Sequence, residues 1–378
     1  MTLARRLAPL LIAAALVPPA AAQGFDTEAR TAIVVDFDTG TVLFDKDADR
    51  IIPPASMSKI MTMYMVFEHI KAGRMSLTDE LPVSKTAWQM GGSKMFVKVD
   101  TRAKVEDLIR GVIVQSGNDA CIVLAEGIAG SEEAFVERMN ARAKEIGLKD
   151  SRFANTTGWP APGHQMSARD LATLATRMIT DFPDFYRYYA EREFTYGGIK
   201  QGNRNPLLYR PLGADGLKTG HTEEAGYGLT ASAKRDGRRV VAVLTGMKSM
   251  RSRAQESERI IEWAFREFDN YTVAKAGQPL ESAEVWLGVN PTVDLAAAAD
   301  VKVTLPRRQR DAIKAVARYE GPIAAPVAAG QRVGTLLIRL DDRTIAETPL
   351  VAAAPVERLG ILGRVWERAL GLVLGHRR

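Results

Sequence analysis

Residues 53–67 read PPASMSKIMTMYMVF, which joins a pair of prolines to an apolar helical pattern. After Lys59, apolar residues recur at the three- and four-residue spacing that marks the buried face of a helix. Proline suits the start of a helix because its missing N–H falls in the first turn, where N–H groups have no partner within the helix. We therefore predict a helix over residues 55–72. Ser56 lies at its start, and Lys59 follows three residues later on the same face.

The segments around this helix alternate between strand and helix patterns. Two apolar runs joined by a turn at residues 38–40 predict a hairpin over residues 31–46. Further helices are predicted over residues 105–130, 132–146, 170–179 and 255–268, and further strands over residues 217–220, 227–233 and 239–244. Strands at both ends with helices between them predict an α+β domain over residues 23–272, with the terminal strands sharing one sheet.

The pattern of predicted secondary structure changes in the last third of the chain. Short strand-like segments separated by Gly, Pro and Asp are predicted over residues 284–289, 301–305, 312–319, 332–340 and 343–350. Strands at this spacing predict a small β-sandwich or barrel, which we place at residues 276–352. No grouping of catalytic side chains is evident in this second domain.

Composition sets the broad class. The 378 residues include 51 Lys and Arg and 45 Asp and Glu, a net charge of +6, and are 46% hydrophobic and 25% charged. This mixture excludes a disordered chain, a collagen-like repeat and a polytopic membrane protein. The length favours two domains, because single cores stop growing at about 250–300 residues. One cysteine, Cys121, excludes an internal disulfide, and the four histidines show no metal-ligand spacing, so no metal and no cofactor are expected.

The amino terminus resembles a secretory signal peptide. Arg5 and Arg6 precede an uncharged apolar run over residues 7–17, followed by two prolines and three alanines. We predict a signal peptide over residues 1–22 that uses the general export route, and a buried helix is the alternative. The mature chain would then work outside the cytoplasm, in the periplasm.

The carboxyl terminus, residues 355–378, is predicted to form one amphipathic helix. Its five arginines and two glutamates give it a net charge of +3, whereas residues 23–354 carry only +1. An apolar face, a basic polar face and one tryptophan are typical of a helix that lies in a membrane interface. Interrupting charges make the segment unsuitable for spanning a bilayer. A helix docked on its own domain is the alternative.

Three motifs in the first domain bear side chains suited to catalysis: Ser56-Met57-Ser58-Lys59, Ser116-Gly117-Asn118 and Lys218-Thr219-Gly220. A serine hydroxyl needs a base, and with no histidine near Ser56 in sequence, Lys59 is the local candidate. An ordinary lysine has a pKa of about 10.4, so a lysine base needs its pKa lowered by roughly 3 units. A second cation such as Lys218 would lower it. Taken alone, the first motif is better explained as an N-capping serine beside a surface lysine, but the three motifs together favour a catalytic site.

In these motifs the chain resembles the serine-type D-alanyl-D-alanine carboxypeptidases, the low-molecular-mass penicillin-binding proteins. The resemblance spans essentially the whole mature chain and includes residues 54–59, 116–121, 167–170, 203–205 and 216–222. It implies a β-lactamase/transpeptidase-like α+β fold, a sheet with helices on both sides, followed by a small all-β domain and a carboxyl-terminal amphipathic helix. The middle motif has glycine where the related β-lactamases have aspartate, and the loop over residues 155–167 is more divergent.

The resemblance implies a role for each motif residue. Ser56 would attack the carbonyl between two D-alanines, Lys59 would take its proton, and Ser116 with Lys218 would relay a proton to the leaving D-alanine. Substrate would be held by Asn118, by Thr219 and Gly220, and by an oxyanion hole formed from the backbone N–H groups of Ser56 and His221. Arg253 and Arg204 are candidates for binding the substrate carboxylate, although ordinary surface charges are the alternative. Cys121 is expected near the site without being the nucleophile.

The resemblance therefore implies a periplasmic D,D-carboxypeptidase that trims peptidoglycan pentapeptides and is acylated by penicillin. Its expected partners are peptidoglycan stem peptides, β-lactam antibiotics and, through residues 355–378, the surface of the cytoplasmic membrane. Nothing in the sequence indicates nucleic acid, and a homodimer stays open. Two alternatives remain: a β-lactamase or D,D-endopeptidase of the same superfamily, and a non-catalytic penicillin-binding or scaffold module.

Overall fold

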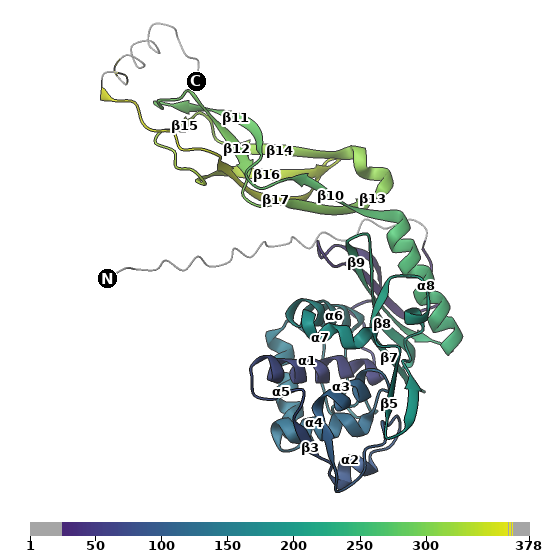
Figure 1. Cartoon of the computed structure of the whole chain (residues 1–378). Helices are drawn as coiled ribbons and strands as arrows, with labels where there is room; N and C mark the ends of the chain where they lie inside the picture. Colours follow the sequence, from purple (N-terminus) through teal and green to yellow (C-terminus); the bar gives the residue numbers. More distant parts are fainter. Residues whose placement is uncertain (1–24, 362, 364, 366–378) are drawn as a thin grey trace, which may run out of the picture. The chain divides into compact units, whose positions relative to one another are not determined.

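The computed structural model describes residues 25–361, 363 and 365, and these form two compact units that divide between Glu267 and Phe268 (Figure 1). The predicted signal peptide lies outside the described residues. The division falls a few residues before the boundary placed at residues 272–276. Each unit has its own core and is described separately.

The first unit is built on one five-stranded antiparallel sheet of strand order β2-β1-β9-β8-β7. Its strands are β1 (Thr31–Asp36), β2 (Val42–Lys46), β7 (Ala214–Thr222), β8 (Gly226–Arg235) and β9 (Arg238–Met247). The amino-terminal β1 pairs with β9, and Thr31 lies opposite Thr245. The prediction that the terminal strands share one sheet is therefore confirmed, and β7 forms an edge of that sheet.

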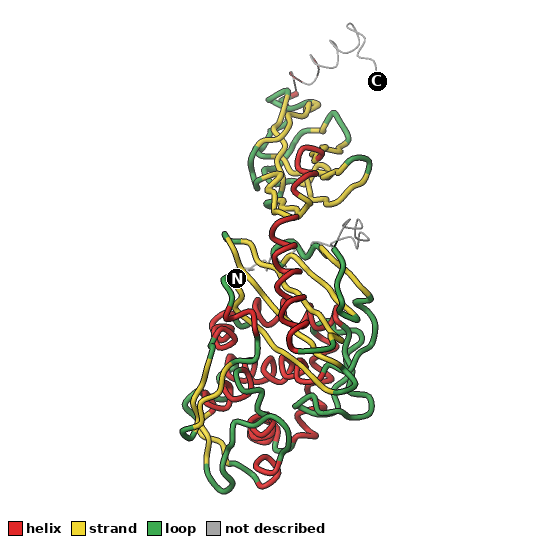
Figure 2. Tube along the Cα trace, turned by 90° about the vertical axis from the view of Figure 1, so that its right-hand side faces the viewer, coloured by secondary structure: helices red, strands yellow, loops and turns green. Residues whose placement is uncertain are grey.

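Helices cover both faces of this sheet, so β1 and β9 are buried along almost their whole length. The helices are α1 (Lys59–Lys71), α2 (Lys85–Gln89), α3 (Val105–Ile113), α4 (Asn118–Ala129), α5 (Glu132–Glu145), α6 (Ala168–Asp181), α7 (Pro183–Tyr186) and α8 (Met250–Glu267). Single 3-10 turns are η1 (Ala55–Ser58), η2 (Arg187–Ala190) and η3 (Pro206–Tyr209). Figure 2 shows α8 running across the strands, and α6 packs against β1 and β9.

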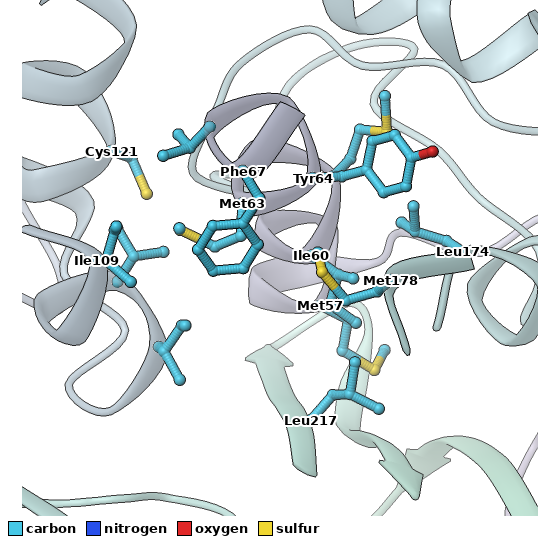
Figure 3. Close-up of a cluster of buried hydrophobic side chains, with 14 of the residues drawn as sticks. Met57, Ile60, Met63, Tyr64, Phe67, Ile109, Cys121, Leu174, Met178 and Leu217 are labelled. Carbon is cyan, nitrogen blue, oxygen red and sulfur yellow. The ribbon is translucent and has the colours of Figure 1, made fainter. Parts of the chain in front are cut away.

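The core of this unit is centred on α1. Ile60, Met63 and Phe67 are fully buried and face side chains from α3, α4 and α6 (Figure 3). The remaining strands form two small ribbons, β3 (Glu80–Pro82) with β4 (Arg102–Lys104) and β5 (Glu193–Tyr196) with β6 (Ile199–Gly202). Because α1 is enclosed on several sides, the turn η1 at its amino-terminal end is held in a fixed position relative to the sheet.

The prediction of one continuous helix over residues 105–130 is wrong, because the chain leaves the helix at Val114 and re-enters it at Asn118. Ser116 adopts a positive φ of 61°, which a helix does not allow. The buried Asp119 carboxylate accepts hydrogen bonds from the backbone N–H groups of residues 95–97, which fixes the start of α4 against a distant loop. The helix predicted over residues 55–72 likewise opens as the 3-10 turn η1.

The second unit is all-β, as predicted, with a six-stranded sheet of order β14-β16-β17-β12-β11-β15 and the separate pair β10-β13. Its elements are β10 (Phe268–Ala274), β11 (Pro279–Trp286), β12 (Thr292–Ala297), β13 (Val301–Pro306), the 3-10 segment η4 (Arg307–Ala312), β14 (Ile313–Tyr319), β15 (Ile323–Ala324), β16 (Arg332–Leu340) and β17 (Arg343–Ala352). Its core is aliphatic, with Leu295, Ile338 and Leu350 fully buried.

The predicted carboxyl-terminal helix does not begin at Pro355. Val356 forms an isolated bridge with Val327, and Arg358 forms one with Gly288, so the chain still follows the β unit at these residues. Helical residues appear only from Ile361, and the rest of the predicted helix lies outside the described residues. Among the residues that the structure describes, no helix has the length and apolar character needed to cross a bilayer.

Candidate active site

Ser56 is held on η1 between two close backbone contacts. A Cβ on Gly220 of β7 would lie 2.9 Å from the Pro54 carbonyl oxygen. On the other side Gly158 has a φ of +77°, and a Cβ there would lie 2.0 Å from the Ala55 carbonyl oxygen. Only glycine allows both approaches, because any larger residue would collide with backbone. Ser56 itself is half-buried, so the residue is partly exposed to solvent while its backbone is enclosed by these contacts.

Lys59 is fully buried beneath Ser56. Its Nζ lies 3.0 Å from Ser56 Oγ and 2.7 Å from Asn118 Oδ1, and it also contacts the Thr157 carbonyl oxygen. Burial, with a smaller contribution from the nearby charge of Arg204, lowers the pKa of Lys59 to about 8. Desolvation, rather than the expected second cation Lys218, is therefore the largest cause of the lowered pKa of Lys59. A substantial fraction of Lys59 is therefore neutral near pH 7.5 and able to accept a proton.

Ser116 and Lys218 form a second serine–lysine pair beside the first. Lys218 Nζ donates to Ser116 Oγ at 2.9 Å, and both side chains are almost completely buried. Ser116 lies in the loop between α3 and α4, whereas Lys218 comes from β7. Burial holds the pKa of Lys218 well below its usual value, and the neighbouring Lys59 lowers it further. Two lysines thus share one poorly solvated region, which disfavours two positive charges there.

Asn118 connects these groups to the wall of the site. Its Oδ1 accepts from Lys59, and its Nδ2 donates to the Gly91 carbonyl oxygen at 2.8 Å. On β7, Thr219 is buried, whereas His221 is exposed and stacks on Tyr227 with ring centroids 3.9 Å apart. All three sequence motifs therefore meet at the end of α1 next to the edge strand β7.

Two arginines lie beside this cluster without a carboxylate partner among the described residues. Arg253 of α8 is buried, lies over the Tyr227 ring at 5.7 Å and donates to the Arg204 carbonyl oxygen at 3.4 Å. Arg204 donates to Ser93 Oγ at 2.6 Å. Burial lowers the pKa of Arg253 to about 10, and partial desolvation lowers the pKa of Arg204, which remains exposed to solvent. A buried guanidinium without a counter-ion is suited to bind an incoming anion.

Several contributors were not found from the sequence. Thr157 acts through a backbone carbonyl, and no side-chain pattern marks such a group. Tyr227 stacks on His221, and the Asp119 carboxylate accepts a hydrogen bond from the backbone of a loop distant in sequence. Both residues hold the site in place without belonging to a predicted motif role. Cys121 is buried close to the site, and burial raises the pKa of its thiol to about 12, so it is an inert thiol rather than a nucleophile (Figure 3).

A serine whose hydroxyl contacts a buried lysine, beside a second serine–lysine pair on an edge strand, defines a serine peptidase that uses lysine in place of histidine. Among the described residues, no cluster of His, Cys, Asp and Glu suitable for a metal ion occurs. Residues 18–249 match the peptidase family described as D-alanyl-D-alanine carboxypeptidase, and residues 268–358 match the penicillin-binding protein 5 carboxyl-terminal domain. The chain belongs to this D-alanyl-D-alanine carboxypeptidase family, the low-molecular-mass penicillin-binding proteins.

Individual relatives are similar to this chain in sequence or in structure over most of its length. The Escherichia coli D-alanyl-D-alanine carboxypeptidase DacC is 42% identical over 348 residues, which cover 90% of this chain and 87% of that protein. Penicillin-binding protein 5 from Haemophilus influenzae superimposes with a TM-score of 0.79 at 35% identity, covering 91% of this chain and all of that one. Penicillin-binding protein D2 from Listeria monocytogenes in its ampicillin-bound form gives a TM-score of 0.59 at 28% identity, covering 64% of this chain and 99% of that chain.

Proposed function

We propose that this protein removes the terminal D-alanine from peptidoglycan pentapeptides through an acyl-enzyme on Ser56. The observation that carries the proposal is the 3.0 Å contact between Ser56 Oγ and the buried Lys59 Nζ. A neutral lysine at this distance can take the hydroxyl proton while the oxygen attacks the penultimate carbonyl. The backbone N–H groups of Ser56 and His221 would then stabilise the developing oxyanion.

The second serine–lysine pair has a matching task in the collapse of the tetrahedral intermediate. The leaving D-alanine nitrogen needs a proton, and the hydroxyl of Ser116 can supply one because Lys218 lies 2.9 Å behind it. Thr219, with Arg253 and Arg204, would bind the carboxylate of the leaving residue. Water then hydrolyses the ester on Ser56 and regenerates the free enzyme.

The same arrangement supports acylation by penicillin. A β-lactam presents a strained amide and a carboxylate, which can occupy the positions of the scissile bond and the terminal carboxylate. The ampicillin-bound Listeria relative supports this extension. Attack by Ser56 opens the ring, and the nitrogen that leaves the carbonyl stays attached to the bound drug.

The function is tested by incubating the mature protein with a peptide that ends in D-Ala-D-Ala and measuring free D-alanine. We expect stoichiometric release of one D-alanine per peptide, together with slow turnover of penicillin. Rapid penicillin hydrolysis without D-alanine release would instead indicate a β-lactamase. The absence of both D-alanine release and a covalent penicillin adduct would indicate a non-catalytic module.

Export and membrane attachment complete the proposal. Residues 1–22 would direct the chain to the periplasm, and the basic amphipathic segment 355–378 would hold it at the anionic surface of the cytoplasmic membrane. Deleting residues 361–378 is expected to move the protein from the membrane fraction to the soluble fraction while D-alanine release per molecule is kept. This cut leaves in place the bridge from Arg358 to Gly288 and the hydrogen bond from the Leu359 backbone N–H to the Leu287 carbonyl oxygen. Undiminished membrane association of the truncated chain would contradict the anchor.

A further inference from the structure

A groove of about 530 Å³ opens directly beside Ser56. It is lined by Pro54 and Ala55 from the chain before α1, by Trp159, Pro160 and His164 from the loop before α6, and by Thr222 and Glu224 at the end of β7. None of these side chains has a task in the chemistry proposed above. The groove is nevertheless continuous with the site, because Ala55 precedes the nucleophile and Thr222 follows His221.

The order of groups along β7 indicates which part of a substrate enters the groove. Lys218, with Ser116, marks the side of the scissile bond where the leaving D-alanine receives its proton. Gly220 lies against η1 and so marks the level of Ser56. Thr222, at the groove, lies about 13 Å from Lys218 along the strand, on the other side of Ser56. The acyl part of the peptide, which precedes the scissile bond, must therefore extend towards the groove.

The walls of the groove are apolar near the site. Trp159 is 47% exposed, and its ring lies so close to Gly92 that a Cβ there would be 2.5 Å from the ring and 2.8 Å from Asn118 Nδ2. Trp159 therefore joins the groove to the wall of the site. With the half-buried Pro53 and the exposed Pro160, which also line the groove, it offers a surface on which the methylene chain of a long side chain can pack.

The rim of the groove carries a free negative charge. The Glu224 backbone carbonyl accepts from Arg30 at 3.5 Å, but its carboxylate forms no ion pair within the described part of the chain. His164 at the groove stays neutral at pH 7, because burial lowers its pKa to about 4. The groove thus combines an apolar wall with an acidic rim, which is complementary to an aliphatic chain that ends in an ammonium group.

We propose that this groove binds the side chain of the residue preceding D-Ala-D-Ala and selects a diamino acid, whose methylene chain packs on Trp159 and whose terminal amine pairs with Glu224. This inference rests on the proposed function and names a specificity determinant for it. The amine of a peptidoglycan stem peptide is free before cross-linking and acylated afterwards, so the groove would favour uncross-linked peptides.

The test compares two peptides, Nα-acetyl-lysyl-D-Ala-D-Ala and its Nε-acetylated counterpart, by D-alanine release at low salt. The wild-type protein is expected to favour the free amine by about three- to fivefold in kcat/KM, which is the effect of one partly exposed ion pair. This preference should fall towards one in Glu224→Gln and also on raising the salt concentration. The matched control is Glu223→Gln, since Glu223 is the adjacent exposed carboxylate but does not line the groove. It should keep the wild-type ratio.

The packing half of the proposal is tested with Trp159→Ala and Trp159→Phe. The alanine variant is expected to lower kcat/KM for the lysyl peptide about tenfold more than for acetyl-D-Ala-D-Ala, which lacks the third residue, and phenylalanine should restore most of the difference. An unchanged amine preference in Glu224→Gln, or equal losses on both peptides in Trp159→Ala, would overturn the groove assignment while leaving the carboxypeptidase activity intact. No D-alanine from any peptide would contradict the proposed function itself, and the groove with it.

Discussion

The Ser56→Ala variant is expected to lose D-alanine release by a factor on the order of 10⁴ or more and to form no covalent adduct with penicillin. The hydroxyl oxygen forms the ester in both reactions, so no other group can replace it without moving. The fold should survive, because Lys59 keeps Asn118 and the Thr157 carbonyl oxygen as acceptors after Ser56 Oγ is removed. The free energy of unfolding should change by only about 1 kcal/mol.

The measurement is incubation with a fluorescent penicillin, followed by mapping of the labelled peptide by mass spectrometry. The chain offers a matched control in Ser58→Ala, two residues away in the same turn. Ser58 is buried and its Oγ donates to the Ala55 carbonyl oxygen at 3.0 Å, so it supports η1 without facing substrate. Ser58→Ala should still be labelled on Ser56. Labelling of Ser56→Ala, or an adduct on any other residue of the wild-type protein, would refute the assignment of the nucleophile.

Much of the catalytic cluster could be predicted, because the order of the motifs and the short spacing within each motif indicate which residues lie together. Ser56 and Lys59 are close in sequence, so a helical start is enough to predict their contact. The meeting of Ser116 with Lys218 depends on tertiary structure, and resemblance to a family supplied what spacing could not. Thr157 contributes a main-chain oxygen from a loop. Because every residue type has a main-chain oxygen, the sequence does not indicate this contact.

The element boundaries that differ from prediction depend on long-range contacts. Residues 105–130 have a helical pattern throughout, and the break at residues 114–117 arises from the hydrogen bonds of Asp119 to a loop more than 20 residues away. In the β unit, β14 and β17 were placed almost to the residue because turn residues flank them. By contrast β12 (Thr292–Ala297) was missed, since its alanines lack the β-branched character of a strand signal.

Rate measurements across pH provide the test of Lys59 as the base. Because Lys59 must be neutral to accept the Ser56 proton, the acylation rate should rise about tenfold per pH unit below pH 7 and level off above its pKa of about 8. A Lys59→Arg variant stays protonated at every accessible pH and is expected to lose a factor on the order of 10³ or more in acylation rate. The decisive measurement is the rate of penicillin adduct formation between pH 5.5 and 10. A flat profile for the wild-type protein would remove Lys59 from this role.

A stability measurement separates this role from a merely structural one. The pKa of Lys59 is lower in the folded protein than in the unfolded chain, so the unfolded state binds more protons between about pH 8 and the ordinary lysine pKa of 10.5. Burial of Lys59 therefore costs most stability below pH 8, and this cost declines as the pH rises towards 10.5. Lys59→Met, which fills similar volume without charge, should be at least as stable as the wild-type protein at pH 7 and lose that advantage at pH 10, as measured by thermal unfolding. A lysine whose burial costs stability because its charge is desolvated gives this dependence of Lys59→Met stability on pH. A structural lysine that stabilises the fold through its hydrogen bonds to Asn118 and Thr157 would instead make Lys59→Met less stable than the wild-type protein at both pH values.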